Sequence, residues 1–163
     1  MIILSEKGLS GIVKILLDVI FIGGILVLLS LPFSLQWYLS FDSFYVNLFS
    51  IHKLTNQYLY VFMLLLLYIT GLFALMIIYE IRKIFKTLNR QNPFMMDNVK
   101  SLRRIAFASF SISLLYILKI IFFYTILTII IVLIFIIAGC FAIIFSEVFK
   151  QAVAVKEEND FTI

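Results

Sequence analysis

The feature that most constrains this chain is an almost unbroken apolar run over residues 105–145, in which Lys119 is the only charged side chain. A single helix of about 40 residues would be ~60 Å long, twice the ~30 Å thickness of the hydrocarbon core of a bilayer. The run therefore predicts two membrane-spanning helices joined by a turn. We expect this turn near residues 119–125, where the Lys119 ammonium can reach the lipid headgroups.

Two shorter apolar runs precede this pair, so the sequence predicts four spans, at residues 12–33, 58–79, 104–122 and 125–146. Each has about 20 residues, the length that crosses the hydrocarbon core. The chain is 64% hydrophobic and 13% charged, whereas soluble domains are about half apolar and a quarter charged. We therefore expect an all-α integral membrane protein with a single four-helix domain over residues 1–163.

Small residues recur on one face of the third and fourth predicted spans. The two stripes are formed by Ala106, Ser109 and Ser113 and by Gly139, Ala142 and Ser146. Small side chains let membrane helices approach closely, so we expect these two spans to pack as an antiparallel hairpin. Gly23 and Gly24 indicate a similar close approach in the first span.

The first span is expected to end at Pro32, because proline lacks an N–H group and terminates a helix there at low cost. Residues 1–11 are expected to lie on the membrane surface. The apolar run is too long for the core of a signal peptide and no small-residue cleavage site follows it, so we expect the span to be retained. Residues 34–57 are rich in aromatic side chains, which favour the headgroup region. They form either an interfacial belt or a surface that senses a lipid-soluble or peptide ligand.

Residues 80–104, between the second and third spans, form a basic connector whose net charge of +5 exceeds the +4 of the whole chain. Cations in short loops stay on the cytoplasmic side of a bilayer, which predicts that both termini are cytoplasmic as well. The outer loops then contain two cations, Lys53 and Lys119. Because the connector cations adjoin apolar spans, we expect them to bind the anionic cytoplasmic leaflet rather than nucleic acid.

The connector is predicted to be a helical hairpin on the cytoplasmic face. Its apolar residues fall at helical spacing on one face, at Ile81, Ile84, Phe85 and Leu88. The second helix should therefore continue two to three turns beyond its span. Asn92 and Pro93 should then break it, because the residue before a proline avoids helical backbone angles. Asn92 can cap the next helix, with Pro93 at its first position.

Residues 147–163 form an acidic tail with four anions and two cations. We expect it to continue the fourth helix and to leave the helix from Asn159 onward. Tail and connector emerge on the same side, so together they could form one docking surface for a cytoplasmic partner. The residues expected in that surface are Arg82, Lys83, Lys86, Arg90, Phe94, Arg103, Arg104, Glu157, Glu158 and Asp160. The alternative is that the tail folds back onto the connector of its own chain.

Asp18 is the most unusual residue, because it lies about 9 Å inside the start of the first span at 1.5 Å per residue. Ionisable residues within membrane spans are candidates for a functional site. Lys14 lies one helical turn earlier and can pair with Asp18 at i, i+4 spacing, and we expect this structural pair. A proton or ion relay would need further ionisable groups at depth, and the second span offers no acidic or basic residue.

No enzyme signature is apparent. The chain has one histidine, His52, and one cysteine, Cys140, roughly 90 residues apart, which does not suggest a metal cluster. Neither a catalytic triad nor a glycine-rich phosphate loop is indicated by the spacing of residues. We therefore expect a protein without catalytic activity, metal or cofactor.

Two of the predicted cytoplasmic stretches resemble a known family. NPFMMDNVKSLRRIA, over residues 92–106, is similar to that family's pattern of Pro-Phe, Asn-Val and Leu-Arg-x-Ile at the start of its third helix. EVFKQAVAVKEENDFTI, over residues 147–163, is similar to its C-terminal signature. The family is the YoaS-like group of bacterial four-span membrane proteins, and the resemblance extends to the length and span layout. The chain departs from it at Arg90-Gln91, where relatives often have a glycine.

The resemblance implies a multi-pass protein of the bacterial cell membrane, of a group often encoded beside a small helix-turn-helix regulator. It implies no particular activity. Our first functional expectation is therefore a regulatory or sensory membrane protein that binds a cytoplasmic partner, such as that transcription regulator. One alternative is a protein that protects the cell against a membrane-active peptide. Another is a small transporter or channel subunit with Asp18 in its pathway.

Overall fold

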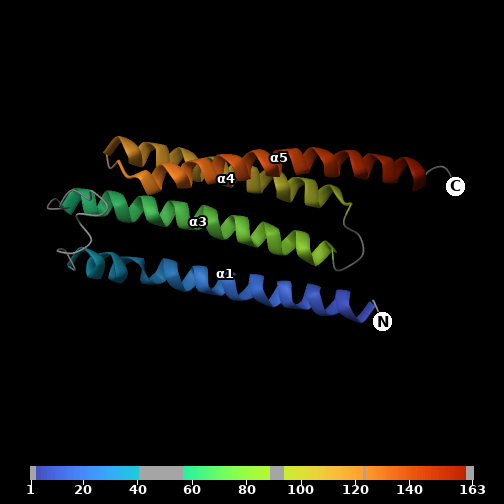
Figure 1. Ribbon diagram of the computed structural model, residues 1–163, viewed down its shortest axis with the longest axis horizontal. Coiled ribbons are helices and arrows are strands. Elements are labelled where there is room, and N and C mark those ends of the chain that lie inside the picture. The colour runs from blue at the N-terminus through green and yellow to red at the C-terminus, as the bar shows by residue number, and fades with distance from the viewer. Residues whose placement is uncertain (1–2, 41–56, 89–93, 123, 161–163) are drawn as a thin grey trace.

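The computed structural model describes residues 3–40, 57–88, 94–122 and 124–160, and each stretch contains one long helix (Figure 1). The helices are α1 (Ile3–Ser40), α3 (Gln57–Leu88), α4 (Met96–Phe122) and α5 (Ile126–Asp160). All four are long and apolar enough to cross a membrane. The described residues contain no strand, so the expectation of an all-helical chain with four potential spans is confirmed.

Consecutive helices run antiparallel, which gives the molecule two ends (Figure 1). We refer to the end where both termini lie, and where α3 ends at Leu88 and α4 begins at Met96, as the connector end. The opposite end, where α4 ends at Phe122 and α5 begins at Ile126, is the loop end. The break between α4 and α5 therefore falls within the range expected for the turn.

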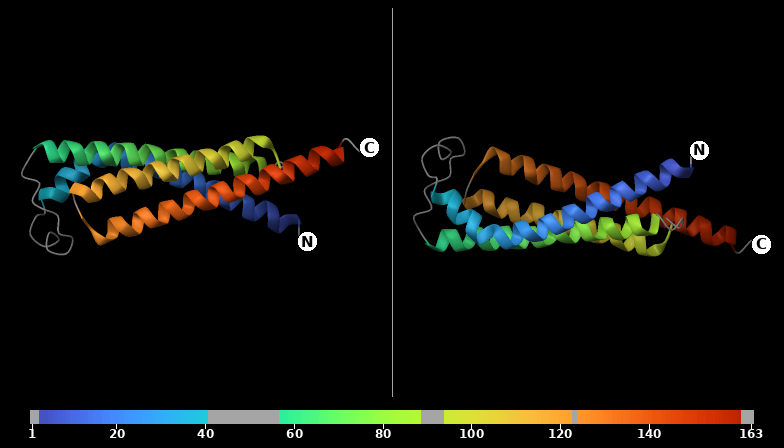
Figure 2. Two further views of the ribbon diagram at one scale, coloured as in Figure 1. Left: turned by 90° about the horizontal axis from the view of Figure 1, so that it is seen from above. Right: turned by 90° about the horizontal axis from the view of Figure 1, so that it is seen from below.

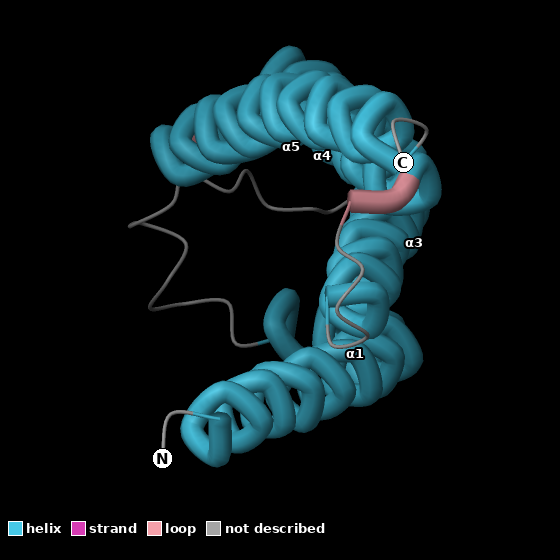
Figure 3. Tube along the Cα trace, turned by 90° about the vertical axis from the view of Figure 1, so that its right-hand side faces the viewer, coloured by secondary structure: helices cyan, strands magenta, loops and turns pink. Residues whose placement is uncertain are grey.

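The helices are arranged in the order of the chain. Helix α1 packs on α3, α3 on α4 and α4 on α5, whereas the described residues of α1 make no contact with α4 or α5. Figure 2 shows the four helices from two further sides, and in Figure 3, which looks along them, they form an open arc rather than a closed bundle. None of residues 11–34 in α1 is buried, so most of this helix is left for lipid or another protein to cover.

Helices α1 and α3 approach each other where glycine leaves room for a leucine. A Cβ atom added at Gly24 would lie 2.8 Å from Cδ2 of Leu75, and one added at Gly71 would overlap the side chain of Leu28. The expected close approach is thus present at Gly24, whereas Gly23 has no atom within 4 Å of its added Cβ position. The contact depends on small residues, as is common between membrane helices.

Helices α4 and α5 form the expected antiparallel hairpin. Small residues of both predicted stripes are buried between the helices: Ala106, Ser109, Ser113, Ala142 and Ser146. Gly139 accommodates the ring of Phe110, whose Cζ atom would lie 2.9 Å from a Cβ atom added at that glycine. At the loop end we expected Lys119 to extend toward the lipid headgroups. Its Nζ atom also contacts α5, since it lies 3.5 Å from the hydroxyl of buried Thr128.

Several helix ends differ from the prediction. Helix α1 includes residues 3–11, which we expected on the membrane surface, and it continues past Pro32 to Ser40. Proline removes a single N–H donor, so only the bond to the carbonyl four residues earlier is lost, and the helix continues beyond it. Beside it the Tyr60 hydroxyl on α3 donates to the Pro32 carbonyl at 3.2 Å, which connects this part of α1 to α3. Of the aromatic segment 34–57, residues 41–56 lie outside the described part of the chain.

The connector and the tail also differ in detail. The expected extension of the second helix is confirmed, since α3 reaches Leu88. Helix α4 begins at Met96 rather than at Pro93, and Asn92 and Pro93 lie outside the described residues. Asp97 stands in the first turn of α4, where a carboxylate interacts favourably with the helix dipole. Helix α5 continues through Asn159 to Asp160, so the prediction that the chain leaves the helix from Asn159 onward was wrong.

Candidate functional site

Charged side chains from all four helices meet at the connector end. Each of the three helix–helix interfaces contains one ion pair there: Asp18–Arg82 between α1 and α3, Glu80–Arg104 between α3 and α4, and Arg103–Glu147 between α4 and α5. These pairs join the helices in series. Three of the connector cations, Arg82, Arg103 and Arg104, therefore connect helices of their own chain.

Asp18 pairs with Arg82 rather than with Lys14, which corrects our expectation for this carboxylate. The order of residues explains the difference, since an acid followed by a base at i, i+4 is more favourable than the reverse order found in Lys14 and Asp18. Arg82 also has a rigid, planar head that can stack on an aromatic ring. Its Cζ atom lies 4.7 Å from the centre of the Phe21 ring, so α1 contacts both the charge and the face of the guanidinium.

Glu80 and Arg104 form the most enclosed of the three pairs. Arg104 Nε lies 2.7 Å from Oε1 of Glu80, and Arg104 Nη2 lies 3.1 Å from Oε2. The Glu80 side chain is 6% exposed and that of Arg104 is 43% exposed. The same Nη2 atom lies 3.4 Å from the hydroxyl of Ser101, which is fully buried. A paired guanidinium head thus compensates a buried carboxylate between α3 and α4.

The base of the tail packs on the start of α4. The rings of Phe94 and Phe149 lie 5.8 Å apart, and Val153 is buried one turn further along α5. Nearby, Arg103 Nη2 lies 3.8 Å from Oε2 of Glu147. Apolar contact and charge together fix the direction in which α5 leaves the other helices.

The connector is also fastened by polar contacts between the end of α3 and the start of α4. The Thr87 hydroxyl lies 2.8 Å from Oδ1 of Asn98, which is buried. The Asn98 N–H donates to the Met95 carbonyl at 3.0 Å, which closes the first turn of α4. These contacts give the two helix ends a defined relative position.

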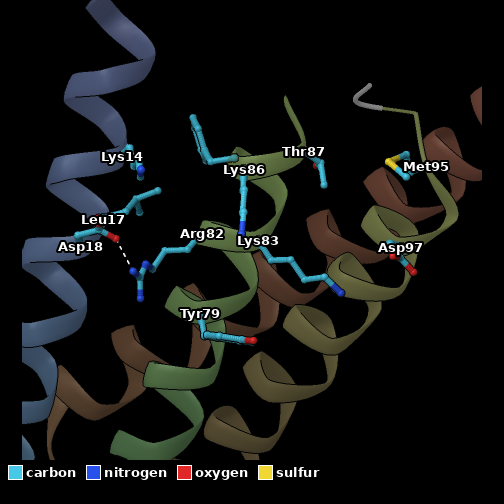
Figure 4. Close-up of a pocket in the computed structure, with 11 residues that line it drawn as sticks. Lys14, Leu17, Asp18, Tyr79, Arg82, Lys83, Lys86, Thr87, Met95 and Asp97 are labelled. Carbon is cyan, nitrogen blue, oxygen red and sulfur yellow. Dashed lines mark ion pairs between the residues drawn. The ribbon is translucent and has the colours of Figure 1, made fainter. Parts of the chain in front are cut away.

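At this end lies an open cleft of about 950 Å³, lined by residues of α1, of α3 and of the start of α4. Lysine side chains of α1 and α3 line it, together with the Asp18–Arg82 pair, which crosses from one helix to the other (Figure 4). Apolar side chains, Leu17 and Phe85 among them, form part of its wall. The arrangement combines positive charge with apolar surface.

The residues that we expected in one docking surface have different surroundings in the structure. Arg82, Arg103 and Arg104 take part in ion pairs within the chain, and Phe94 packs on Phe149. Lys83 and Lys86 line the cleft. Glu157 and Glu158 are exposed near the far end of α5. Arg90 and the side chain of Asp160 lie outside what the structure describes.

The sequence analysis did not single out Glu80, Glu147 or Phe149 as contact residues. A signal for the two glutamates was present, because each directly follows an apolar span, and Arg103 and Arg104 directly precede another. Phe149 had no comparable signal, since its role depends on where Phe94 lies in space. Among the described residues there is no group of three or more His, Cys, Asp or Glu side chains that could bind a metal ion.

Comparisons with known proteins place most of this chain in a family. No curated protein and no solved structure matches it. One family matches residues 50–163, a region that includes α3, α4 and α5 but not α1. The resemblance seen in the sequence is thus supported at the level of an uncharacterised family, although the match carries neither the YoaS-like name nor a neighbouring gene. The chain belongs to the family described as Protein of unknown function (DUF2975).

Proposed function

We propose that this protein is a non-enzymatic regulatory protein of a bacterial cell membrane that binds a cytoplasmic protein through the projecting end of α5. The observation that carries the proposal is the length of this helix, which continues to Asp160. Its last strongly apolar stretch ends near Ser146, so about 14 residues, roughly 21 Å of helix, extend beyond it. Figures 1 and 2 show this end projecting past the other helices.

The orientation in the membrane is part of the proposal. The connector end carries most of the cations of the chain, and such clusters remain in the cytoplasm. With the connector inside, the ends of α1 and α5 that lie beside it are inside as well. The projecting helix would then be presented to cytoplasmic proteins.

The charge of the projecting helix indicates the kind of partner. Glu157 and Glu158 are exposed on it, and the sequence adds Asp160 at its end. An acidic helix favours a partner with a basic surface, because complementary charge directs encounter and orientation. A helix-turn-helix regulator has such a surface where it binds DNA phosphates. Capture at the membrane would therefore compete with DNA binding, which gives the proposed regulatory effect a physical basis.

A crosslinking pull-down from native membranes tests the proposal. Wild-type protein is compared with the double variant Glu157→Gln/Glu158→Gln and with the control Glu6→Gln/Asp97→Asn, which removes the same charge from the starts of α1 and α4. We expect a basic protein to be captured by wild type and control but lost from the first variant, with capture weakening as salt screens the charges. Recovery of the same proteins by all three would contradict the proposal.

A further inference from the structure

The cleft between α1 and α3 at the connector end contains more positive charge than its own carboxylates neutralise. Four cations line it, against the carboxylates of Asp18 and Asp97. Asp18 is already paired with Arg82. The remaining cations are Lys14, Lys83 and Lys86, and none of them forms an ion pair with a residue in the described part of the chain. Three ammonium groups therefore share one cleft with a single further carboxylate.

The cleft is also well placed to contact lipid. Leu17 on α1 and Tyr79 on α3 line it, and Tyr79 is exposed. Beyond Leu17 this side of α1 continues with exposed apolar side chains at helical spacing, Ile20 and Val27. A cationic region at the end of two spans thus adjoins an apolar flank that runs along the membrane. A molecule that matched both parts would need an anionic head and hydrocarbon chains.

We propose that this cleft binds one anionic glycerophospholipid, with the phosphate group between Lys14 and Lys86 and the acyl chains along the apolar flank of α1. Basic pockets between membrane helices at the cytoplasmic side are suited to such headgroups. The Asp18–Arg82 pair, stacked on Phe21, forms a fixed boundary at the deep side of the headgroup (Figure 4). A zwitterionic lipid is disfavoured, because its own cation would meet the lysines. This proposal does not depend on the one made for α5.

Native mass spectrometry of the full-length protein, purified in a neutral detergent, tests the site. Phosphatidylglycerol and phosphatidylcholine with the same acyl chains are the probes, and glycerol 3-phosphate serves as a soluble competitor. We expect wild-type protein to retain one phosphatidylglycerol in preference to phosphatidylcholine. Glycerol 3-phosphate should not displace it at equal concentration, because it lacks the acyl chains. Equal displacement would show that the ligand is a free phosphate compound and would overturn the proposal of a lipid.

Matched variants locate the binding. Lys14→Gln/Lys86→Gln should weaken phosphatidylglycerol binding about 30-fold, whereas Lys14→Arg/Lys86→Arg should retain it. The control Lys100→Gln/Lys150→Gln removes the same charge from α4 and α5 and should leave binding nearly unchanged. If the first double variant does not fold, as judged by its melting temperature in phosphatidylcholine, Lys86→Gln alone should weaken binding about fivefold, because Lys86 is exposed. Equal weakening in cleft and control variants, or loss of binding with arginine, would overturn the site.

Discussion

An ionised carboxylate in a membrane-spanning helix is costly unless a cation lies beside it. Asp18 illustrates how the partner is chosen. Lys14 is nearer in sequence, but Arg82 reaches the carboxylate from the next helix and also contacts Phe21. The cost of an acidic residue in α1 is thus offset by a contact that aligns α1 with α3.

Double-mutant cycles should reveal this choice of partner. The Asp18→Asn and Arg82→Gln changes should be coupled by about 0.5–1 kcal/mol, the upper range for pairs of partly exposed charges. The side chains of Asp18 and Arg82 are 35% and 34% exposed. Asp18→Asn and Lys14→Gln should be coupled by no more than about 0.3 kcal/mol. Thermal unfolding in neutral detergent measures both cycles, and a larger coupling with Lys14 would refute the Arg82 pairing.

The Glu80–Arg104 pair should matter more for stability than the exposed pair at Glu147. Glu80→Gln leaves the Arg104 head without its counter-charge between α3 and α4, and we expect a loss of about 1–3 kcal/mol in the free energy of unfolding. The matched change Glu147→Gln affects a side chain that is 52% exposed and should cost less than about 1 kcal/mol. Chemical unfolding in detergent compares the two, and equal losses would mean that burial of Glu80 is unimportant.

The four spanning-length helices of the described residues could be predicted from the sequence, because apolar runs of membrane-spanning length have few alternatives. Their ends could not. Pro32 indicated a helix end, but α1 continues to Ser40, and the contact of this part of α1 with Tyr60 of α3 depends on packing that the sequence does not show. For the same reason the cations and anions of the connector could be identified in advance, whereas the pairing of Arg104 with Glu80 required knowledge of which helix faces which.

Glycines that look alike in the sequence should respond differently to substitution. Gly139→Leu would collide with the Phe110 ring at the α4–α5 interface, whereas Gly23→Leu would enter open space. Both changes raise helix propensity equally, so the difference reports packing alone. We expect Gly139→Leu to destabilise the protein by about 1–3 kcal/mol and Gly23→Leu to leave it unchanged or slightly more stable, as measured by melting temperature. Similar melting temperatures for both variants would argue against the close α4–α5 contact.

Taken together, the helices divide into two parts. Helices α3, α4 and α5 lie within the region that matches the family and contain all the residues that are buried in the described part of the chain. Helix α1 lies outside the match and has none between residues 11 and 34. The lipid cleft lies at the junction of these parts. A lipid bound in the cleft would add contacts to the α1–α3 interface, the least extensive of the three. It would therefore favour the association of α1 with α3, α4 and α5.

The orientation of the whole molecule is the last prediction, and it follows from the cations at the connector end. In a protein in which Cys140 is replaced by alanine, single cysteines are introduced as Ser43→Cys, between the first two spans, and Gln151→Cys, on the exposed surface of α5 beyond the last span. A membrane-impermeant maleimide should label the first in intact cells and the second only after permeabilisation, because basic segments remain in the cytoplasm. The cysteine-free protein provides the background. Labelling of Gln151→Cys in intact cells would place the connector end outside. A cytoplasmic transcription regulator could then not reach the acidic end of α5, and the anionic inner leaflet could not reach the cleft.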